Sequence, residues 1–194
     1  MNELREAIRR EGKGIGQHIV KVDMFLNHRL DTRLMFDMGR DLADHFRKEV
    51  PDIVLTVEAS GIAIALATAH KLGDIPVVFA KKSQAANQGD DMLTAMAHSF
   101  THGNDNHLRV DRHYLPKGSR VLIVDDFLAN GQATEALMSI VKQAECELVG
   151  IGIAVEKGFQ DGGKILREKG INLKSLVIVT GIEEIGRASC RERV

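Results

Sequence analysis

Short apolar runs, separated by segments in which apolar positions recur at helical spacing, are the main pattern of this chain. The apolar runs are four to eight residues long and rich in Val, Ile and Leu. Continuous runs of this kind are typical of parallel strands buried on both faces, with helices as the connections between them. They occupy residues 53–57, 76–80, 121–124, 148–155 and 176–179. We therefore predict an α/β fold in which helices cover both faces of a parallel sheet.

The segments between these runs predict the helices. Apolar side chains repeat as in an amphipathic helix, and breaker residues mark two of the helix ends, Pro51 after the second segment and Gly73 after the third. The predicted helices are residues 2–11, 32–49, 61–72, 132–144 and 164–169. A brief extended piece is expected at residues 18–22, after a Gly-rich step at residues 12–16.

Residues 82–115 break this alternation. Gln, Asn and Asp are dense between positions 84 and 91, and short alternating pieces follow at 93–100 and 107–110. We interpret the stretch as a mobile loop that leads into an antiparallel excursion, because long insertions in compact domains are usually functional or disordered. Internal repeats and a clear linker are both missing from the sequence, so residues 1–183 are expected to form a single domain.

The last eleven residues, 184–194, differ in character from the rest of the chain. Their sequence, EIGRASCRERV, looks like the in-frame translation of a common sequencing adapter. On that interpretation the segment is non-native, Cys190 included, and the natural C-terminus is missing; the alternative is a charged, frayed end. In either case we leave the segment out of the fold prediction.

Composition narrows the class of protein. Hydrophobic residues make up 44% and charged residues 27%, and the formal net charge is -1. A balanced charge forces no basic face for nucleic acid, and two cysteines argue against a disulfide framework. The sequence contains no signal-peptide core and no apolar run near the roughly 20 residues that a membrane span needs. We expect a cytoplasmic enzyme that binds neither nucleic acid nor membrane.

One strand–turn–helix segment carries the strongest functional pattern. Residues 121–134 read VLIVDDFLANGQAT, in which a buried strand ends in Asp125 and Asp126 and a turn of small residues opens a helix. The unpaired N–H groups and partial positive charge at a helix start attract phosphate. Ala129 and Gly131 let the backbone approach the anion. The two carboxylates leave the strand on opposite sides, so at least one of them can accept hydrogen bonds from sugar hydroxyls. The segment therefore predicts a site for a sugar that carries a phosphate.

Three alternative structures share parts of this pattern. An ordinary strand, turn and helix could carry the acid pair by chance. A receiver domain also has an Asp-Asp pair, but usually after its first strand and not two-thirds along the chain. A P-loop nucleoside triphosphatase would combine the acidic strand with residues 158–165, GFQDGGKI. That motif requires Ser or Thr where Ile165 stands, and the order of the two segments is reversed.

The same segment resembles the motif with which type I phosphoribosyltransferases bind phosphoribosyl pyrophosphate (PRPP). It matches throughout, except that Asn130 stands where many members have Thr. The resemblance implies that Asp125 and Asp126 take part in catalysis and that the turn and helix start bind PRPP. The implied PRPP-binding residues are Ala129, Asn130, Gly131, Gln132, Ala133 and Thr134.

Two further segments fit the pyrophosphate site of that family. Ser60 and Gly61 follow a strand and open a helix, although Ser-Gly is also a common helix start in general. Lys81 and Lys82 follow the next strand, where a cation would stabilise the leaving pyrophosphate; solvated lysines are the alternative. The polar loop at residues 83–94 is then expected to be a flap that keeps water away from PRPP.

The N-terminal part narrows the resemblance. Residues 20–28, VKVDMFLNH, together with ANGQA and the EKGFQ run at 156–160, are similar to the bacterial xanthine phosphoribosyltransferases, and the similarity extends from residue 1 to about residue 183. It implies that Val20, Asn27 and Lys157 contact the purine. The departures are Asn130, an apparent one-residue lengthening at residues 73–76, and the terminal segment.

The resemblance also implies the reaction and its partners. Xanthine and PRPP would be the substrates, Mg²⁺ would arrive on PRPP, and the enzyme would be a homodimer. A small hood over the site would come from about residues 15–30 and the C-terminal part. Guanine, hypoxanthine or adenine as the base remain alternatives, as does a non-catalytic PRPP-sensing regulator. Purine repressors of that kind carry an N-terminal DNA-binding domain, for which residues 1–16 are too short and too mixed in charge.

Four histidines in the excursion invite a metal site. Their spacings fit no helix face consistently, and no cysteine lies among them. We therefore predict no metal site built by the protein itself. The four residues are His98, His102, His107 and His113.

Overall fold

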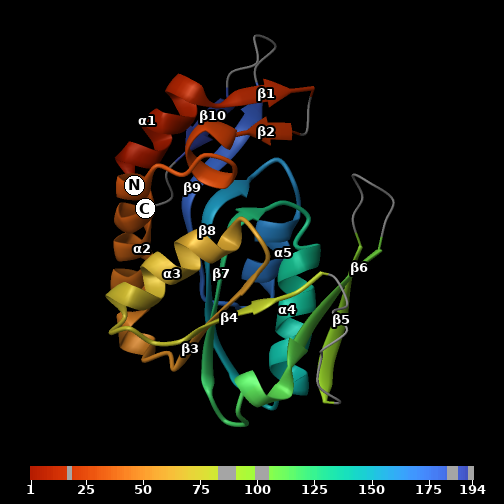
Figure 1. Cartoon of the computed structure of the whole chain (residues 1–194). Helices are drawn as coiled ribbons and strands as arrows, with labels where there is room; N and C mark the ends of the chain where they lie inside the picture. The colour runs from red at the N-terminus through yellow and green to blue at the C-terminus, as the bar shows by residue number, and fades with distance from the viewer. Residues whose placement is uncertain (17–18, 83–90, 99–104, 183–187, 192–194) are drawn as a thin grey trace.

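A five-stranded parallel sheet forms the centre of the protein (Figure 1). The computed structural model describes residues 1–16, 19–82, 91–98, 105–182 and 188–191. The strand order is β9-β8-β7-β3-β4, and all neighbours in this order are parallel. The strands are β3 (Ile53–Val57), β4 (Val77–Ala80), β7 (Arg120–Leu128), β8 (Glu147–Lys157) and β9 (Leu173–Ile182). Each overlaps one predicted apolar run, which confirms the predicted fold class.

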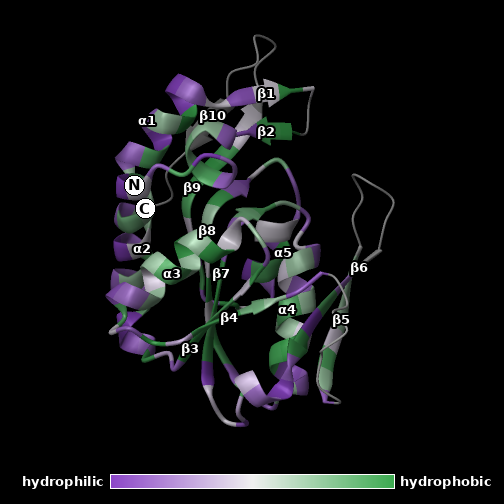
Figure 2. Cartoon of the chain, in the orientation of Figure 1, coloured by the Kyte–Doolittle hydropathy of each residue, from purple (hydrophilic) through white to green (hydrophobic). Residues whose placement is uncertain are grey.

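Successive side chains of a strand point to opposite sides of the sheet. Here both sets of side chains are buried, so the sheet has two covered faces. Val54 and Leu122 pack on one face, and Leu55 and Ile123 pack on the other. The first face is covered by α1 (Asn2–Glu11), α2 (Thr32–Phe46) and α3 (Gly61–Lys71). The second is covered by α4 (Gln132–Gln143), α5 (Gly162–Glu168) and a hairpin. Figure 2 shows the central strands as largely hydrophobic between helices of mixed character.

The helices agree with the sequence pattern to within a few residues. Asp31 caps α2, where its side chain accepts a hydrogen bond from the backbone N–H of Leu34 at 3.0 Å. A short 3-10 turn, Arg47–Glu49, continues α2 to the predicted end. None of the helices in the described ranges is long and apolar enough to cross a bilayer.

The predicted antiparallel excursion is confirmed as a hairpin of β5 (Met92–His98) and β6 (Asp105–Asp111). The side chain of Gln143, at the end of α4, donates to the backbone oxygen of Thr94 at 2.9 Å. At the mouth of β4, Lys81 and Arg109 exchange two backbone hydrogen bonds of 2.9 Å. The hairpin is thereby attached both to α4 and to the sheet. Most of the predicted flap lies in residues 83–90, outside the described residues.

The N-terminal segment differs in part from the prediction. An antiparallel pair of β1 (Lys13–Ile15) and β2 (Ile19–Lys21) stands where a Gly-rich step and one extended piece were expected. One turn of π-helix, Asp23–Asn27, follows it. Such turns are rare, and they occur often at functional sites. β1 was missed because three residues between glycines carry no periodic signal.

The strand β7 is longer than predicted, which changes the position of the acid pair. The apolar run was expected to end before Asp125, but β7 continues through Phe127 and Leu128, which pair with Val155 and Glu156 of β8. Asp125 and Asp126 therefore lie within the strand and not beyond its end. The sequence pattern placed the end of the strand at the polar pair. The strand continues beyond it because it pairs with β8, a non-local interaction that a local sequence pattern does not contain.

The backbone of residues 188–191 forms β10 (Ala188–Arg191), which pairs antiparallel with β9 at the edge of the sheet. This strand lies in the segment that was left out of the fold prediction. A backbone pairing of this kind accepts many sequences, because its hydrogen bonds involve no side chains. The adapter origin of residues 184–194 stays a prediction.

Candidate functional site

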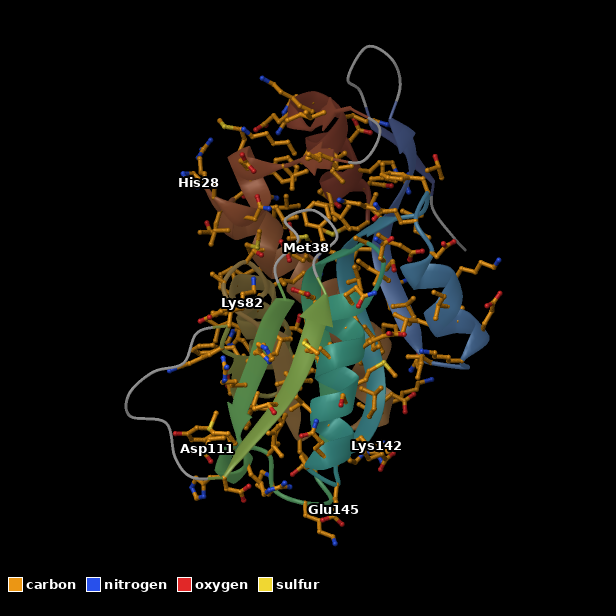
Figure 3. All side chains as sticks on the ribbon, turned by 90° about the vertical axis from the view of Figure 1, so that its right-hand side faces the viewer. His28, Met38, Lys82, Asp111, Lys142 and Glu145 are labelled. Carbon is orange, nitrogen blue, oxygen red and sulfur yellow. The ribbon has the colours of Figure 1, made fainter. Side chains whose placement is uncertain are left out.

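An open pocket of about 690 Å³ lies at the carboxyl ends of the central strands. Ligands of parallel α/β sheets bind at this edge because the loops and helix starts converge there. Most of the residues predicted to bind substrate border the pocket, although they come from separate parts of the chain. They are Ser60, Lys82, Asp125, Asp126, Ala129, Asn130, Gly131, Gln132, Ala133, Thr134 and Lys157. In Figure 3, Lys82 lies between His28 of the N-terminal segment and Asp111 at the end of β6.

The acid pair on β7 is buried but borders the pocket. Asp125 is 4% exposed and Asp126 is 7% exposed. The backbone N–H of Asp126 donates to Oδ1 of Asp125 at 3.0 Å. Burial raises the pKa of Asp125 well above its ordinary value, and the neighbouring charge of Asp126 raises it further, while the charge of Lys82 offsets these effects in part. Asp125 is thus poor at holding a negative charge, and both carboxyl groups border the pocket, where hydroxyl donors of a ligand can reach them.

The turn after β7 presents backbone N–H groups to the pocket. Gly131 has φ 85° and ψ 4°, a left-handed conformation that favours glycine, and it directly precedes α4. The first N–H groups of a helix have no partner within the helix. Residues 129–134 all border the pocket. Unpaired N–H groups at a helix start can bind a phosphate, and those of α4 lie beside the pocket.

A second turn packs against the first, and the sequence analysis did not predict this contact. The backbone N–H of Gly162, the first residue of α5, donates to the oxygen of Ala129 at 3.1 Å. A Cβ on Gly162 would lie 2.7 Å from the backbone nitrogen of Gly131. The glycines that made residues 158–165 resemble a P-loop therefore serve close packing. The contact could have been suspected from the sequence, because the pair Gly162-Gly163 follows a strand at this edge of the sheet and leaves room for another backbone.

Residues 159–161 also form part of the pocket wall and were not predicted. They are Phe159, Gln160 and Asp161. The backbone N–H of Gln160 donates to the oxygen of Lys157 at 2.9 Å, which closes the turn after β8. Their position follows from the length of β8, which extends to Lys157 and carries the turn as far as the pocket.

The predicted pyrophosphate residues occupy different positions. Ser60 and Lys82 border the pocket, and the backbone N–H of Lys82 donates to Glu58. Gly61 is buried at the start of α3, where a Cβ would lie 2.6 Å from Oδ1 of Asp125. Lys81 is exposed and does not border the pocket. The structure thus places Ser60 and Lys82 together with the acid pair and keeps Gly61 as a close backbone contact behind it.

The predicted purine residues are only partly brought together. Lys157 borders the pocket with its Nζ 5.7 Å from the centre of the Phe127 ring, and burial lowers the pKa of its ammonium group. Val20 is buried in β2, and Asn27 is exposed at the end of the π-helical turn. Neither borders the pocket, whereas Ile19, the residue before Val20 in β2, does. The N-terminal segment therefore reaches the pocket through β2.

This arrangement of an acid pair, a glycine turn and a helix start on a parallel sheet defines the protein as one of the phosphoribosyltransferase class. The family model described as "Phosphoribosyl transferase domain" matches residues 30–170, and the chain belongs to that family. Within this family, the relatives whose sequences match almost the whole chain are named xanthine phosphoribosyltransferase.

Three of these relatives come from clostridia. Xanthine phosphoribosyltransferase 1 of Clostridium perfringens is 46% identical over 184 residues, which are 95% of this chain and 97% of the relative. The xanthine phosphoribosyltransferase of Clostridioides difficile is 44% identical over 94% of this chain and 96% of its own length. The xanthine phosphoribosyltransferase of Ruminiclostridium cellulolyticum is 46% identical over 192 residues, which are 99% of this chain and 100% of the relative.

Solved structures agree on the fold. Adenine phosphoribosyltransferase of Giardia lamblia, crystallised with 9-deazaadenine, has a TM-score of 0.73 at 19% identity and covers 90% of this chain and 97% of its own. The adenine phosphoribosyltransferase of Rhodothermus marinus has a TM-score of 0.72 at 20% identity, and the match covers 92% of this chain and 100% of the Rhodothermus chain. At this level of identity the likeness concerns the fold alone.

Proposed function

We propose that the protein transfers the 5-phosphoribosyl group of PRPP to xanthine and releases xanthosine 5'-monophosphate and pyrophosphate, a step of purine salvage. The observation that carries this proposal is the similarity of nearly the whole chain to relatives named xanthine phosphoribosyltransferase. The pocket supports it, because a phosphate-binding helix start, an acid pair and two lysines surround a single volume.

PRPP would bind along the carboxyl edge of the sheet. The N–H groups at the start of α4 would hold the 5'-phosphate, and Asp125 and Asp126 would accept hydrogen bonds from the ribose hydroxyls. Ser60 and Lys82 border the same pocket and would face the pyrophosphate. Mg²⁺ would enter as part of the substrate; oxygen ligands suit it. Among the described residues, no three His, Cys, Asp or Glu side chains form a metal-binding group of their own.

The base would bind on the side of Lys157. Its ammonium group can donate to a carbonyl of xanthine or offset negative charge on a partly ionised ring. Partial burial strengthens such an interaction, because fewer water molecules compete with the base. Xanthine has carbonyl groups at positions 2 and 6, whereas adenine has none, so Lys157 favours an oxopurine.

The transfer itself needs no covalent intermediate with the protein. The bond from C1' of the ribose to the pyrophosphate oxygen breaks, and pyrophosphate leaves with the electron pair. N9 of the base bonds to C1', and its proton passes to solvent water. The protein would contribute by holding the two reactants in line and by placing the acid pair near the ribosyl cation and a lysine near the leaving group.

One steady-state assay tests this function. Purified protein is supplied with PRPP and Mg²⁺ together with xanthine, guanine, hypoxanthine or adenine in separate reactions. We expect the highest kcat/KM with xanthine. Product from adenine alone would contradict the assigned base, and product from guanine or hypoxanthine in preference to xanthine would move the assignment to those bases. No product from any base, with PRPP still bound, would indicate a PRPP-sensing regulator.

We also propose that the enzyme is a homodimer in the cytoplasm. Large apolar side chains are exposed on two helices that pack against each other, with Phe36 on α2 51% exposed and Leu66 on α3 62% exposed. Exposed apolar groups on neighbouring elements suit a subunit interface. Sedimentation equilibrium should give twice the chain mass of 21.4 kDa. A monomer at all concentrations tested would contradict the proposal.

A further inference from the structure

Outside the pocket, the structure contains a second buried carboxylate whose partners are all protein groups. Glu156, near the end of β8, is 3% exposed. Its two oxygens accept hydrogen bonds from Nη1 and Nη2 of Arg167 at 2.7 and 2.6 Å. The hydroxyl of Ser175 donates to the second oxygen at 2.5 Å. These three residues, the Glu156 cluster, connect β8, α5 and β9.

The geometry of the Glu156 cluster makes it rigid. A two-pronged contact between a guanidinium and a carboxylate fixes both the distance and the relative orientation of the groups. These hydrogen bonds raise the pKa of Arg167 above its ordinary value. Removal of one partner would leave the other charge buried without compensation, which is unfavourable. The cluster therefore holds α5 in one position against the sheet.

One turn of backbone joins the Glu156 cluster to the predicted PRPP site. A Cβ on Gly163 would lie 2.5 Å from Cδ of Glu156 and 2.7 Å from Nη1 of Arg167, so the start of α5 rests directly on the cluster. The adjacent residue, Gly162, donates to Ala129 in the turn before α4. Lys157, which follows Glu156 in the chain, borders the pocket from the base side.

We propose that Glu156, Arg167 and Ser175 are positioning residues, which fix α5 so that Gly162 supports the phosphate-binding turn and which fix the end of β8 from which Lys157 meets the base. The proposal rests on the proposed function, since it concerns the same PRPP and base sites. It predicts that substrate affinity depends on a cluster that no substrate touches.

The test compares two glutamates on the same strand. Glu156→Gln keeps the size of the side chain but removes its charge. Glu147→Gln is the matched control, because Glu147 lies at the opposite end of β8 and accepts hydrogen bonds of 2.8 and 2.7 Å from Arg120, far from the pocket residues. Arg167→Lys and Ser175→Ala are milder variants that retain the fold if Glu156→Gln does not.

Affinity for Mg·PRPP is measured by isothermal titration calorimetry, and KM and kcat are measured for both substrates. We expect Glu156→Gln to weaken PRPP binding and to raise the KM for the base by about 10-fold, the usual scale when residues that support a ligand-binding group are lost. Arg167→Lys should change PRPP affinity and the KM for the base less than Glu156→Gln does, and Ser175→Ala should change them least of the three. In Glu147→Gln both values should stay within about twofold of wild type.

If Glu156→Gln and Arg167→Lys lower only the melting temperature and leave PRPP affinity and both KM values equal to those of Glu147→Gln, the cluster is merely structural and the proposal is wrong. Should Glu156→Gln fail to fold, unchanged affinities in Arg167→Lys and Ser175→Ala would overturn the proposal in the same way. Wild-type protein that binds PRPP but forms no xanthosine monophosphate would overturn the proposed function, and a loss of that binding in Glu156→Gln would still support the positioning role.

Discussion

Two neighbouring strands each carry buried carboxyl groups near their carboxyl ends, and their surroundings differ. On β7, Asp125 and Asp126 both border the pocket, and burial raises the pKa of Asp125. On β8, Glu156 is equally buried, but Arg167 and Ser175 occupy both of its oxygens. The raised pKa of Asp125 means that its charge is not fully compensated, as expected where a substrate supplies further partners. Glu156 is compensated within the protein, as expected of a structural group.

The largest effect is expected from an acid that is proposed to meet the substrate. Asp126→Asn keeps the shape of the side chain but removes the carboxylate that is proposed to lie beside the ribose. We expect kcat/KM to fall by about 100-fold, the scale on which one preorganised electrostatic contact acts in a transition state. Steady-state kinetics with Mg·PRPP and xanthine measure the change, and a rate equal to that of wild type would remove Asp126 from the ribose contact.

The contact between the two turns is tested by Gly162→Ala. The added methyl group would meet the backbone of Ala129 and Gly131, which cannot move without displacing the turn that is proposed to bind phosphate. We expect the KM for PRPP to rise by about 10-fold. Gly170→Ala is the control, because Gly170 has φ 72° with open space around it and so carries backbone strain alone. It should cost about 1 kcal/mol of stability and leave the KM for PRPP unchanged.

Lys157→Ala separates the base side of the pocket from the PRPP side. We expect the KM for xanthine to rise by about 10-fold, equivalent to about 1.4 kcal/mol, with a much smaller change in the affinity for PRPP. The reason is that Lys157 lies at the end of β8, whereas the turn that is proposed to bind phosphate follows β7. Kinetics with each substrate varied in turn measure both values; equal losses for the two substrates would count against a role in base binding.

The smallest expected effect is a gain in stability from Asp125→Asn. The raised pKa of Asp125 means that its ionised form is disfavoured in the folded state. The wild type therefore loses stability as the pH rises from the ordinary value of 3.8 through the raised pKa. The Asn variant should be more stable by about 1 kcal/mol at neutral pH, and this gain should shrink as the pH falls. Urea unfolding at pH 7.5 and pH 5 tests this. A stability gain of the Asn variant that is larger at pH 5 than at pH 7.5 would contradict the expected pH dependence.

The sequence predicted the parts of the site that are local in the chain. The strand, acid pair, turn and helix of residues 121–134 follow one another directly, so periodicity and small residues reveal them. The contact of Gly162 with Ala129 and the pairing of Glu156 with Arg167 arise only when β8 has been placed beside β7 and β9. The same holds for Phe127 and Leu128, whose strand conformation depends on β8.

The predicted base residues show the limit of a resemblance. Lys157 borders the pocket, but Val20 is buried in β2 and Asn27 is exposed at the end of a π-helical turn. A motif specifies which residues occur in order along the chain. It does not specify how a short, glycine-flanked segment folds over the site. The purine roles of Val20 and Asn27 stay predictions.

The central claim is that the backbone N–H groups at the start of α4 hold the 5'-phosphate of PRPP while the acids of β7 hold its ribose. A crystal structure of the protein with saturating PRPP and Mg²⁺ tests this most directly. We predict a phosphate within hydrogen-bonding distance of the N–H groups of residues 131–134 and ribose hydroxyls at Asp125 and Asp126. An empty turn, with PRPP bound elsewhere or absent, would contradict the account.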